Sequence, residues 1–237
     1  LFIGTSGVGK TETTRQLAKF LFGSDTAILR LGINGFEDVN FLAKLSNRPH
    51  SIVLFDEVDK ANPAFVDMFL KIFDEGYIAQ PSGKMIDVSN TIFIMTSNLL
   101  PDKHISFGDA QKIDKVALDD LKGYYRPEFL NRIDDIIIFN KLTENEVIKI
   151  LELMITDLNE TLTKQYEVNI EFDMQAKKAI VKEGFSEEYG ARELRRDFEK
   201  MIKIPLGHII LAKEIGKSKT WLVTTGKSEE IVIEKKK

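Results

Sequence analysis

The chain contains no cysteine, and its three histidines, His50, His104 and His208, lie far apart in the sequence. Without cysteine there can be no disulfide bond, no thiol nucleophile and no cysteine metal site. Scattered histidines give little support to a histidine metal site. No apolar run approaches the length needed to cross a bilayer, and no segment resembles a signal peptide. We therefore expect a cytoplasmic protein with no membrane partner.

An excess of positive charge is also lacking, since the formal net charge at pH 7 is −4. This balance argues against nucleic acid as the main partner, because neutralising the phosphates of duplex DNA requires a basic face. A hydrophobic content of 43% and a charged content of 30% are ordinary for a globular protein. The length of 237 residues fits one large domain or two modest ones.

The segment from Gly4 to Thr11 reads GTSGVGKT, a complete phosphate-binding loop of the form G-x-x-x-x-G-K-[ST]. In such a loop the backbone N–H groups surround a triphosphate, Lys10 contacts the β- and γ-phosphates, and the Thr11 hydroxyl can hold Mg²⁺. A strand is predicted before the loop and a helix after it, so the helix N-terminus faces the phosphates. The alternative is a chance glycine turn. The predicted ATP-binding residues are Thr5, Ser6, Gly7, Val8, Gly9, Lys10, Thr11 and Glu12.

Strands and helices alternate over the first 140 residues, which favours a parallel sheet covered on both faces. The predicted strands have continuous apolar runs, as expected for strands that are buried on both sides. They are Leu1–Ile3, Ile28–Leu31, Ile52–Phe55, Thr91–Thr96 and Ile136–Phe139. After the third strand, Asn62, Pro63 and Gly76 are positioned to cap, begin and end a helix.

The pattern changes near Lys141, where Thr143 and Glu146 form a capping-box signature at the start of a long helix. The segments that follow are a strand at Val168–Phe172, a helix from about Met174 to Lys182, a helix from about Ala191, and strands around Thr220–Thr224 and Glu230–Ile233. We therefore predict an α/β core over residues 1–140 and a smaller, mostly helical domain with short strands over residues 141–237.

Two carboxylates, Asp56 and Glu57, follow the apolar strand Ile52–Phe55. ATP hydrolysis needs one acid that orders Mg²⁺ and a second that orients or deprotonates the attacking water. Asp56 fits the first role and Glu57 the second, at the edge where open α/β sheets bind ligands. The alternative is a pair of acids placed near the N-terminus of the next helix.

Asn98 follows the strand Thr91–Thr96, whose carboxyl end lies at the same edge of a parallel sheet as Thr11 and Asp56. An amide at this position can hold the attacking water or the γ-phosphate. The alternative is that Ser97 and Asn98 are simply turn residues.

These motifs, in this order, resemble those of the AAA+ ATPases, and more narrowly the second ATPase module of the Clp-type protein unfoldases, the ClpB, ClpA and ClpC group. The matching segments are GTSGVGKTE at 4–12, LFDEVDKANP at 54–63, IMTSN at 94–98, YRPEFLNRID at 125–134 and YGARELRR at 189–196. The resemblance covers nearly the whole chain. It implies a P-loop core with a five-stranded parallel sheet and a lid. It also implies a hexameric ring motor that uses Mg²⁺ and ATP to pull polypeptides through a central channel.

The resemblance also implies roles for three arginines. Arg132 matches the arginine finger that reaches into the neighbouring subunit's ATP site, where it would neutralise charge on the γ-phosphate. Its alternative is a surface ion pair with Asp134 or Asp135. Arg192 matches the second sensor, which reaches from the lid to the nucleotide; its alternative is a salt bridge with Glu188. Arg126 matches a further arginine near the subunit interface.

The sequence departs from the family in the segment before the strand at Ile52, which is about twenty residues short by family comparison. The segment from Asn34 to Asp38 lacks the usual aromatic-glycine pore loop. Either the pore residues are absent from this sequence but present in the protein, or the protein lacks the loop, which would argue against threading but not against hydrolysis. A second loop, a hairpin from Gly76 to Ile86, survives and faces the channel in the family. The tripeptide that docks a ClpP-type peptidase is matched only approximately by Ile105–Gly108, which disfavours that partner.

The chain begins inside its first strand. We expect either that the sequence is a piece of a longer protein or that part of the usual base-binding pocket is missing. The main hypothesis is an ATP-hydrolysing protein unfoldase or disaggregase module. The alternatives are a nucleic-acid remodelling AAA+ ATPase and a nucleotide-binding assembly module without motor activity.

Overall fold

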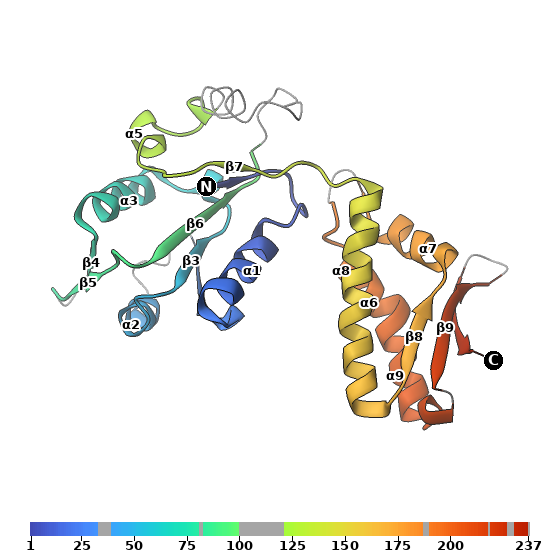
Figure 1. The fold of residues 1–237 in the computed structure, drawn as a ribbon. Helices are drawn as coiled ribbons and strands as arrows, with labels where there is room; N and C mark the ends of the chain where they lie inside the picture. Colours follow the sequence, from blue (N-terminus) through green and yellow to red (C-terminus); the bar gives the residue numbers. More distant parts are fainter. Residues whose placement is uncertain are drawn as a thin grey trace. The chain divides into compact units, whose positions relative to one another are not determined.

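A computed structural model describes residues 1–32, 39–80, 83–99, 121–186, 190–217, 219–226 and 230–236. These residues form two compact units. The first comprises Leu1–Thr5 and Gly9–Asn140, and the second comprises Ser6–Val8 and Lys141–Lys237 (Figure 1). Each unit has its own hydrophobic core. Among the described residues, no helix is long and apolar enough to traverse a membrane.

The first unit is built on a five-stranded sheet in the order β2-β3-β6-β1-β7, and all of its neighbouring strands pair in parallel. The strands are β1 (Phe2–Ile3), β2 (Ile28–Leu31), β3 (Ile52–Phe55), β6 (Ile92–Ser97) and β7 (Ile137–Ile138). All four residues of β3 are buried. The parallel sheet predicted from the continuous apolar runs is therefore confirmed.

Helices cover both faces of this sheet, because successive strand residues point to opposite sides. On one face, Ile52 and Leu54 pack with Ala18 of α1 (Lys10–Phe22). On the other face, Val53 and Phe55 pack against three other helices. These helices are α2 (Val39–Asn47), α3 (Pro63–Glu75) and α5 (Pro127–Leu130). Over its described residues this unit also contains η1 (Asp25–Ala27), η3 (Val58–Lys60) and the antiparallel pair β4 (Tyr77–Ala79) and β5 (Met85–Asp87).

Helix α3 begins and ends as its sequence predicts. The Asn62 side chain accepts a hydrogen bond from the Phe65 N–H at 2.9 Å, and Pro63 occupies the first turn. At the other end Gly76 adopts a left-handed conformation with φ 70°, and its N–H donates to the Ile72 carbonyl. Asparagine caps, proline at the first turn and glycine at the end are the usual signals of a helix. They fix the length of α3, the helix that comes after η3 and the two candidate carboxylates.

The second unit packs helices against a three-stranded sheet in the order β10-β9-β8, in which β8 and β9 are parallel and β9 and β10 antiparallel. Its helices are α6 (Glu144–Tyr166), α7 (Met174–Gly184), α8 (Leu194–Phe198), the π-helical segment η4 (Glu199–Lys203), α9 (Ile204–Leu211) and the short η5 (Ile215–Lys217). Its strands are β8 (Asn169–Phe172), β9 (Thr220–Thr225) and β10 (Ile231–Lys235). The mostly helical C-terminal domain with short strands is confirmed, although the helix expected from about Ala191 begins at Leu194.

Three side chains, Thr143, Glu146 and Asn159, bond backbone groups at and beside the long helix α6. The predicted capping box is present: the Thr143 N–H donates to the Glu146 carboxylate at 2.7 Å, and the Glu146 N–H donates to the Thr143 hydroxyl at 3.4 Å. Further along, the Asn159 amide bonds both backbone groups of Ile170, with distances of 2.7 and 2.9 Å. Because β8 is an edge strand, these bonds satisfy groups that no neighbouring strand pairs.

Candidate active site

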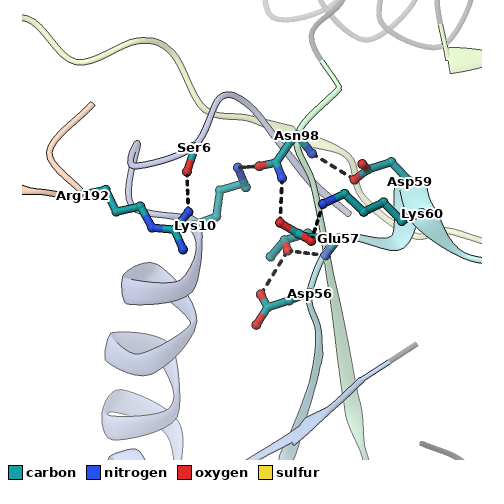
Figure 2. Close-up of polar contacts among 9 residues, drawn as sticks. Ser6, Lys10, Asp56, Glu57, Asp59, Lys60, Asn98 and Arg192 are labelled. Carbon is teal, nitrogen blue, oxygen red and sulfur yellow. Dashed lines mark hydrogen bonds and ion pairs between the residues drawn. The ribbon is translucent and has the colours of Figure 1, made fainter. Parts of the chain in front are cut away.

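The candidate active site lies where β1, β3 and β6 end, at the carboxyl edge of the five-stranded sheet. The pairing of Ile3 with Ser97 and of Phe55 with Met95 brings the residues after these strands together. A hydrogen bond from the Gly4 N–H to the Ser97 carbonyl, 3.2 Å long, extends the pairing into the phosphate-binding loop. Figure 2 shows the polar side chains that gather at this edge.

Lys10 is buried at this edge, with 8% of its surface exposed. Its ammonium donates to the carbonyl oxygens of Gly4 at 2.6 Å and Thr5 at 2.8 Å, and to Oδ1 of Asn98 at 3.1 Å (Figure 2). Burial lowers the pKa of Lys10, and the carboxylates of Asp59, Asp56 and Glu57 partly oppose that shift. A desolvated ammonium with neutral hydrogen-bond partners is well suited to bind an anion that brings its own charge.

The backbone of the loop depends on glycine where α1 begins. Gly9 precedes the helix with a φ of 102°, a conformation that residues with a Cβ rarely adopt. Thr11 lies in the first turn of α1 and is half-buried, whereas the Glu12 carboxylate bonds Arg15 at 2.6 Å and Gln16 at 2.9 Å along the helix surface. Glu12, one of the predicted ATP-binding residues, thus has both carboxylate oxygens bonded to side chains of its own helix.

One hydroxyl of β6 bonds both residues that follow β3, the side chain of Asp56 and the backbone of Glu57. Thr96 donates a hydrogen bond to Oδ1 of Asp56 at 3.1 Å and accepts one from the Glu57 N–H at 3.2 Å. Glu57 itself has left-handed backbone angles, φ 60° and ψ 48°. That conformation costs a residue with a Cβ roughly 1–2 kcal/mol. Strain of this kind is characteristic of functional sites, where the surrounding structure holds it in place.

The Glu57 carboxylate contacts two side chains, as Figure 2 shows. Its Oε1 accepts a hydrogen bond from the Asn98 amide at 3.3 Å, and its Oε2 accepts one from Lys60 at 2.7 Å. The hydrogen bond and charge of Glu57 raise the pKa of Lys60. The Asn98 N–H in turn donates to Oδ1 of Asp59 at 3.1 Å. The structure therefore brings Lys10, Glu57 and Asn98 into one hydrogen-bonded group.

Arg192 forms its described contact within the second unit, to which Ser6–Val8 belong. Its guanidinium donates to the Ser6 hydroxyl at 3.2 Å (Figure 2). Beside it, the Ala191 N–H donates to the Gly7 carbonyl at 3.2 Å. Gly190 has a φ of +57°, and a Cβ there would lie 2.9 Å from the Gly7 oxygen. Glycine is therefore required at position 190 by both its backbone angle and its close neighbour.

Arg132 and Arg126 lie on the surface of the first unit. Arg132 pairs with Asp74 of α3 and keeps 51% of its side chain exposed. Its partner is thus neither of the two aspartates that follow it in the sequence. Arg126 pairs with Asp67 of the same helix, and more loosely with Glu128 at 3.7 Å.

Both units match families of known proteins. Residues 31–136 match the AAA domain (Cdc48 subfamily), and residues 142–223 match the C-terminal, D2-small domain of ClpB protein. The chaperone protein ClpB of Aquifex aeolicus is 35% identical over 265 residues, covering 99% of this chain and 26% of that protein. The ClpC ATP-binding subunit of Staphylococcus aureus is 37% identical, covering 89% of this chain and 30% of that protein.

A solved structure, the S. cerevisiae Hsp104-ADP complex, superposes with a TM-score of 0.84 and 32% identity, covering 98% of this chain and 45% of that one. The chain belongs to the Clp group of AAA ATPases. It is an ATPase module of the type found in ClpB, ClpC and Hsp104, as its motifs predicted. The Clp module spans between about a quarter and a half of the length of these relatives. Its alignment with ClpB is longer than its own 237 residues, so the relative contains residues with no counterpart here.

Several predictions about the Clp module fall outside the described residues. These are the shortened pore-loop segment Asn34–Asp38, the peptidase-docking match Ile105–Gly108 and the alternative partner Glu188. The predicted hairpin is present as β4 and β5, with Tyr77 and Met85 exposed and Ile78 and Ile86 buried.

Three polar residues of the site were not singled out from the sequence: Thr96, Asp59 and Lys60. All three lie inside motifs that were recognised, Thr96 in IMTSN and the other two in LFDEVDKANP. The contacts of Thr96 and Asp59 depend on the register between β3 and β6, which their spacing in the sequence does not show, whereas Lys60 pairs with Glu57 three residues before it.

Proposed function

We propose that ATP binds at the carboxyl edge of the five-stranded sheet and that Glu57 activates the water that attacks its γ-phosphate. The observation that carries this proposal is the hydrogen-bonded group of Lys10, Glu57 and Asn98. It places a cation, a carboxylate and an amide within one small region beside the phosphate-binding loop. These are the groups that phosphoryl transfer to water requires.

Lys10 and the loop backbone would bind the triphosphate. The two carbonyl oxygens and the amide that now accept hydrogen bonds from Lys10 are neutral, so a phosphate competes favourably for its charge. Thr5, Ser6, Gly7, Val8 and Gly9 would contribute backbone N–H groups to the same anion. Glu12 would join only after exchanging its partners on α1.

Thr11 and Asp56 would hold Mg²⁺. Both offer oxygen donors, which Mg²⁺ prefers, and Mg²⁺ usually keeps several waters beside one or two carboxylates and the substrate phosphates. Among the described residues no group of three or more histidine, cysteine, aspartate or glutamate side chains could hold a metal. When bound, the ion would neutralise charge that develops on the phosphates.

Glu57 and Asn98 would position the water. In the present arrangement the Glu57 carboxylate contacts both Asn98 and Lys60. A carboxylate held by an amide on one side can accept a proton from a water on the other. Lys60 would release the carboxylate for this role, because an exposed ion pair of this kind is weak.

Arg192 and Arg132 would complete the site. The hydrogen bond from Arg192 to Ser6 supports a role for Arg192 in contacting the nucleotide bound by the loop. Arg132 is exposed and its pair with Asp74 is exposed as well, so it is free to exchange partners. We propose that it acts on the ATP of a neighbouring subunit in a hexameric ring, with Arg126 near the same interface.

The substrate would be polypeptide, as in ATP-driven protein unfolding or disaggregation. The exposed Tyr77 and Met85 of the β4–β5 hairpin offer apolar contacts to an unfolded chain. A docked ClpP-type peptidase is not part of the proposal, nor is nucleic acid or a membrane. A cytoplasmic location remains our prediction from the cysteine-free composition.

The function is tested by measuring ATP turnover and oligomer mass of the intact protein with added partners. We expect an ATP-dependent oligomer whose turnover rises with a permanently unfolded polypeptide and not with double-stranded DNA. Stimulation by DNA alone would overturn the proposal in favour of a nucleic-acid remodelling ATPase. A persistent monomer without turnover would favour an assembly module.

A further inference from the structure

The junction of β3 and β6 contains two reciprocal side chain–backbone hydrogen bonds beyond the last strand pair. The ladder between these strands ends where Phe55 pairs with Met95. Past that point, the Glu57 N–H donates to the hydroxyl of Thr96 at 3.2 Å, and the Asn98 N–H donates to the carboxylate of Asp59 at 3.1 Å. Each chain segment thus lends one side chain to a backbone group of the other.

These two bonds bracket the Glu57–Asn98 contact. Glu57 and Asn98 touch through their side chains at 3.3 Å, while their backbone N–H groups are the two that the reciprocal bonds hold. A side chain whose backbone is fixed has fewer positions to sample. The relative placement of carboxylate and amide therefore depends on Thr96 and Asp59.

The buried Thr96 hydroxyl bonds two residues of the candidate site at once. Thr96 is 3% exposed, and its single hydroxyl serves both residues after β3, donating to Asp56 and accepting from Glu57. The residue that it holds, Glu57, is in the left-handed region. A strained conformation persists only when its surroundings specify it, and the Thr96 hydroxyl supplies one such contact from a rigid strand.

We propose that Thr96 and Asp59 are positioning residues that set the geometry of Glu57 and Asn98 for attack on the γ-phosphate. The two residues need not touch nucleotide, metal or water themselves. They act through the backbone N–H groups of Glu57 and Asn98, and Thr96 acts also through the carboxylate of Asp56. This inference rests on the proposed function, since it assumes that Glu57 and Asn98 act on ATP.

Thr96→Val and Thr96→Ser form a matched pair that tests the first half. Valine keeps the shape and removes the hydroxyl, whereas serine keeps the hydroxyl. We expect Thr96→Val to lower kcat for ATP hydrolysis by about 10- to 100-fold with little change in KM or in thermal unfolding. We expect Thr96→Ser to restore turnover to within about threefold of wild type. Equal turnover of Thr96→Val and wild type would overturn the role of Thr96, and so would failure of serine to rescue.

Asp59→Asn and Asp59→Ala test the second half. Asparagine keeps an oxygen that can accept the Asn98 N–H but removes the charge, and alanine removes both. If Asp59 acts by its hydrogen bond, Asp59→Asn retains most of the turnover and Asp59→Ala loses roughly tenfold in kcat at unchanged KM. Equal losses in both variants would show that the charge beside Lys10 matters instead, which would overturn the positioning role of Asp59.

The intact protein and a Glu57→Gln variant should be measured in parallel. If wild type does not hydrolyse ATP, or Glu57→Gln hydrolyses it as fast, the proposed function fails. If Glu57→Gln is inactive while Thr96→Val and Asp59→Ala match wild type, only the present inference fails.

Discussion

The two units of the molecule differ in what they bury. All of the buried side chains that carry a charge or a hydroxyl, among the described residues, lie in the first unit: Lys10, Thr14, Ser51, Thr96, Ser97 and Tyr125. In the second unit the buried side chains are hydrophobic, and the one buried N–H among them, on Trp221, is satisfied by the Ile215 carbonyl at 3.0 Å. The first unit thus retains polar groups in its interior that the second does without.

The difference separates a region built for chemistry from a region built for packing. Burying a polar group is unfavourable unless it is hydrogen-bonded, and burying a charge is more so. Lys10 and Thr96 are buried and fully engaged at the edge where the carboxylates lie, and Glu57 beside them is strained. The buried cation, the buried hydroxyl and the strained residue lie together at one edge of the sheet, which marks it as the functional region.

An exposed polar residue of the first unit, Arg132, tests whether groups outside the buried cluster also contribute to hydrolysis. Replacing Arg132 with alanine should lower ATP turnover of the assembled protein by about a thousandfold if it is an arginine finger. Replacing its partner Asp74 with alanine should leave turnover at least as high as in wild type, because it only frees Arg132. Steady-state ATPase assays at saturating ATP measure both.

Arg132→Ala with full turnover would contradict the finger role and leave Arg132 as a surface ion pair. A loss in Asp74→Ala as large as that in Arg132→Ala would show that the ion pair, not the free arginine, supports hydrolysis.

The second unit can be destabilised by a substitution in its core that changes none of the proposed catalytic residues. Phe198 is fully buried in its core, so Phe198→Ala should destabilise the second unit by about 3–5 kcal/mol. Chemical unfolding, followed by the fluorescence of Trp221 in the same core, measures the loss. Leu211→Ala is the matched control, since Leu211 is 81% exposed and its truncation should leave the unfolding midpoint unchanged. Equal effects of the two changes would contradict this account of the core.

A substitution of Lys10 tests the opposite case, in which ATP binding is weakened and the stability of the fold is retained. Lys10→Ala should weaken ATP binding by about 3 kcal/mol, because it removes the one buried cation of the loop. Thermal stability without nucleotide should be retained, since a desolvated charge leaves the interior. Calorimetric titration with ATP and a thermal unfolding scan decide the case. Wild-type affinity in Lys10→Ala would contradict the proposed phosphate site.

The smallest predicted effect concerns the capping box of α6. Thr143→Ala should lower the unfolding free energy of the second unit by about 1 kcal/mol, the usual cost of losing an N-cap. Hydrogen bonds from the Thr143 backbone N–H and hydroxyl lower the pKa of Glu146 below its ordinary value of 4.5. Stabilisation from Glu146 is therefore fully present above pH 4.5 and is lost as the pH falls through the lowered pKa.

The free energy of unfolding of wild type and of Glu146→Ala should be measured at pH 7 and in acid. We expect the difference between the two proteins to be smaller in acid than at pH 7. A difference that does not depend on pH would contradict the ionised capping box.

The sequence predicts those parts of the molecule that local rules determine. Continuous apolar runs indicate the parallel strands, and Asn62, Pro63 and Gly76 bound α3 as observed. The proximity of Asp56 and Glu57 to the phosphate-binding loop follows from the rule that the carboxyl ends of parallel strands meet at one edge of the sheet. Contacts that depend on register and tertiary approach could not be predicted. The hydrogen bonds of Thr96 with the residues after β3, the pair of Arg132 with Asp74, and the close approach of Gly190 to Gly7 each join segments that no periodicity connects.

The most direct test of the central claim is ATP binding and hydrolysis by Glu57→Gln in the intact protein. Glutamine keeps the shape of the side chain and its contact with Asn98 but cannot take a proton from water. We predict that the variant binds Mg²⁺ and ATP as tightly as wild type and hydrolyses it about 10²- to 10⁴-fold more slowly. Wild-type turnover in Glu57→Gln would contradict the account.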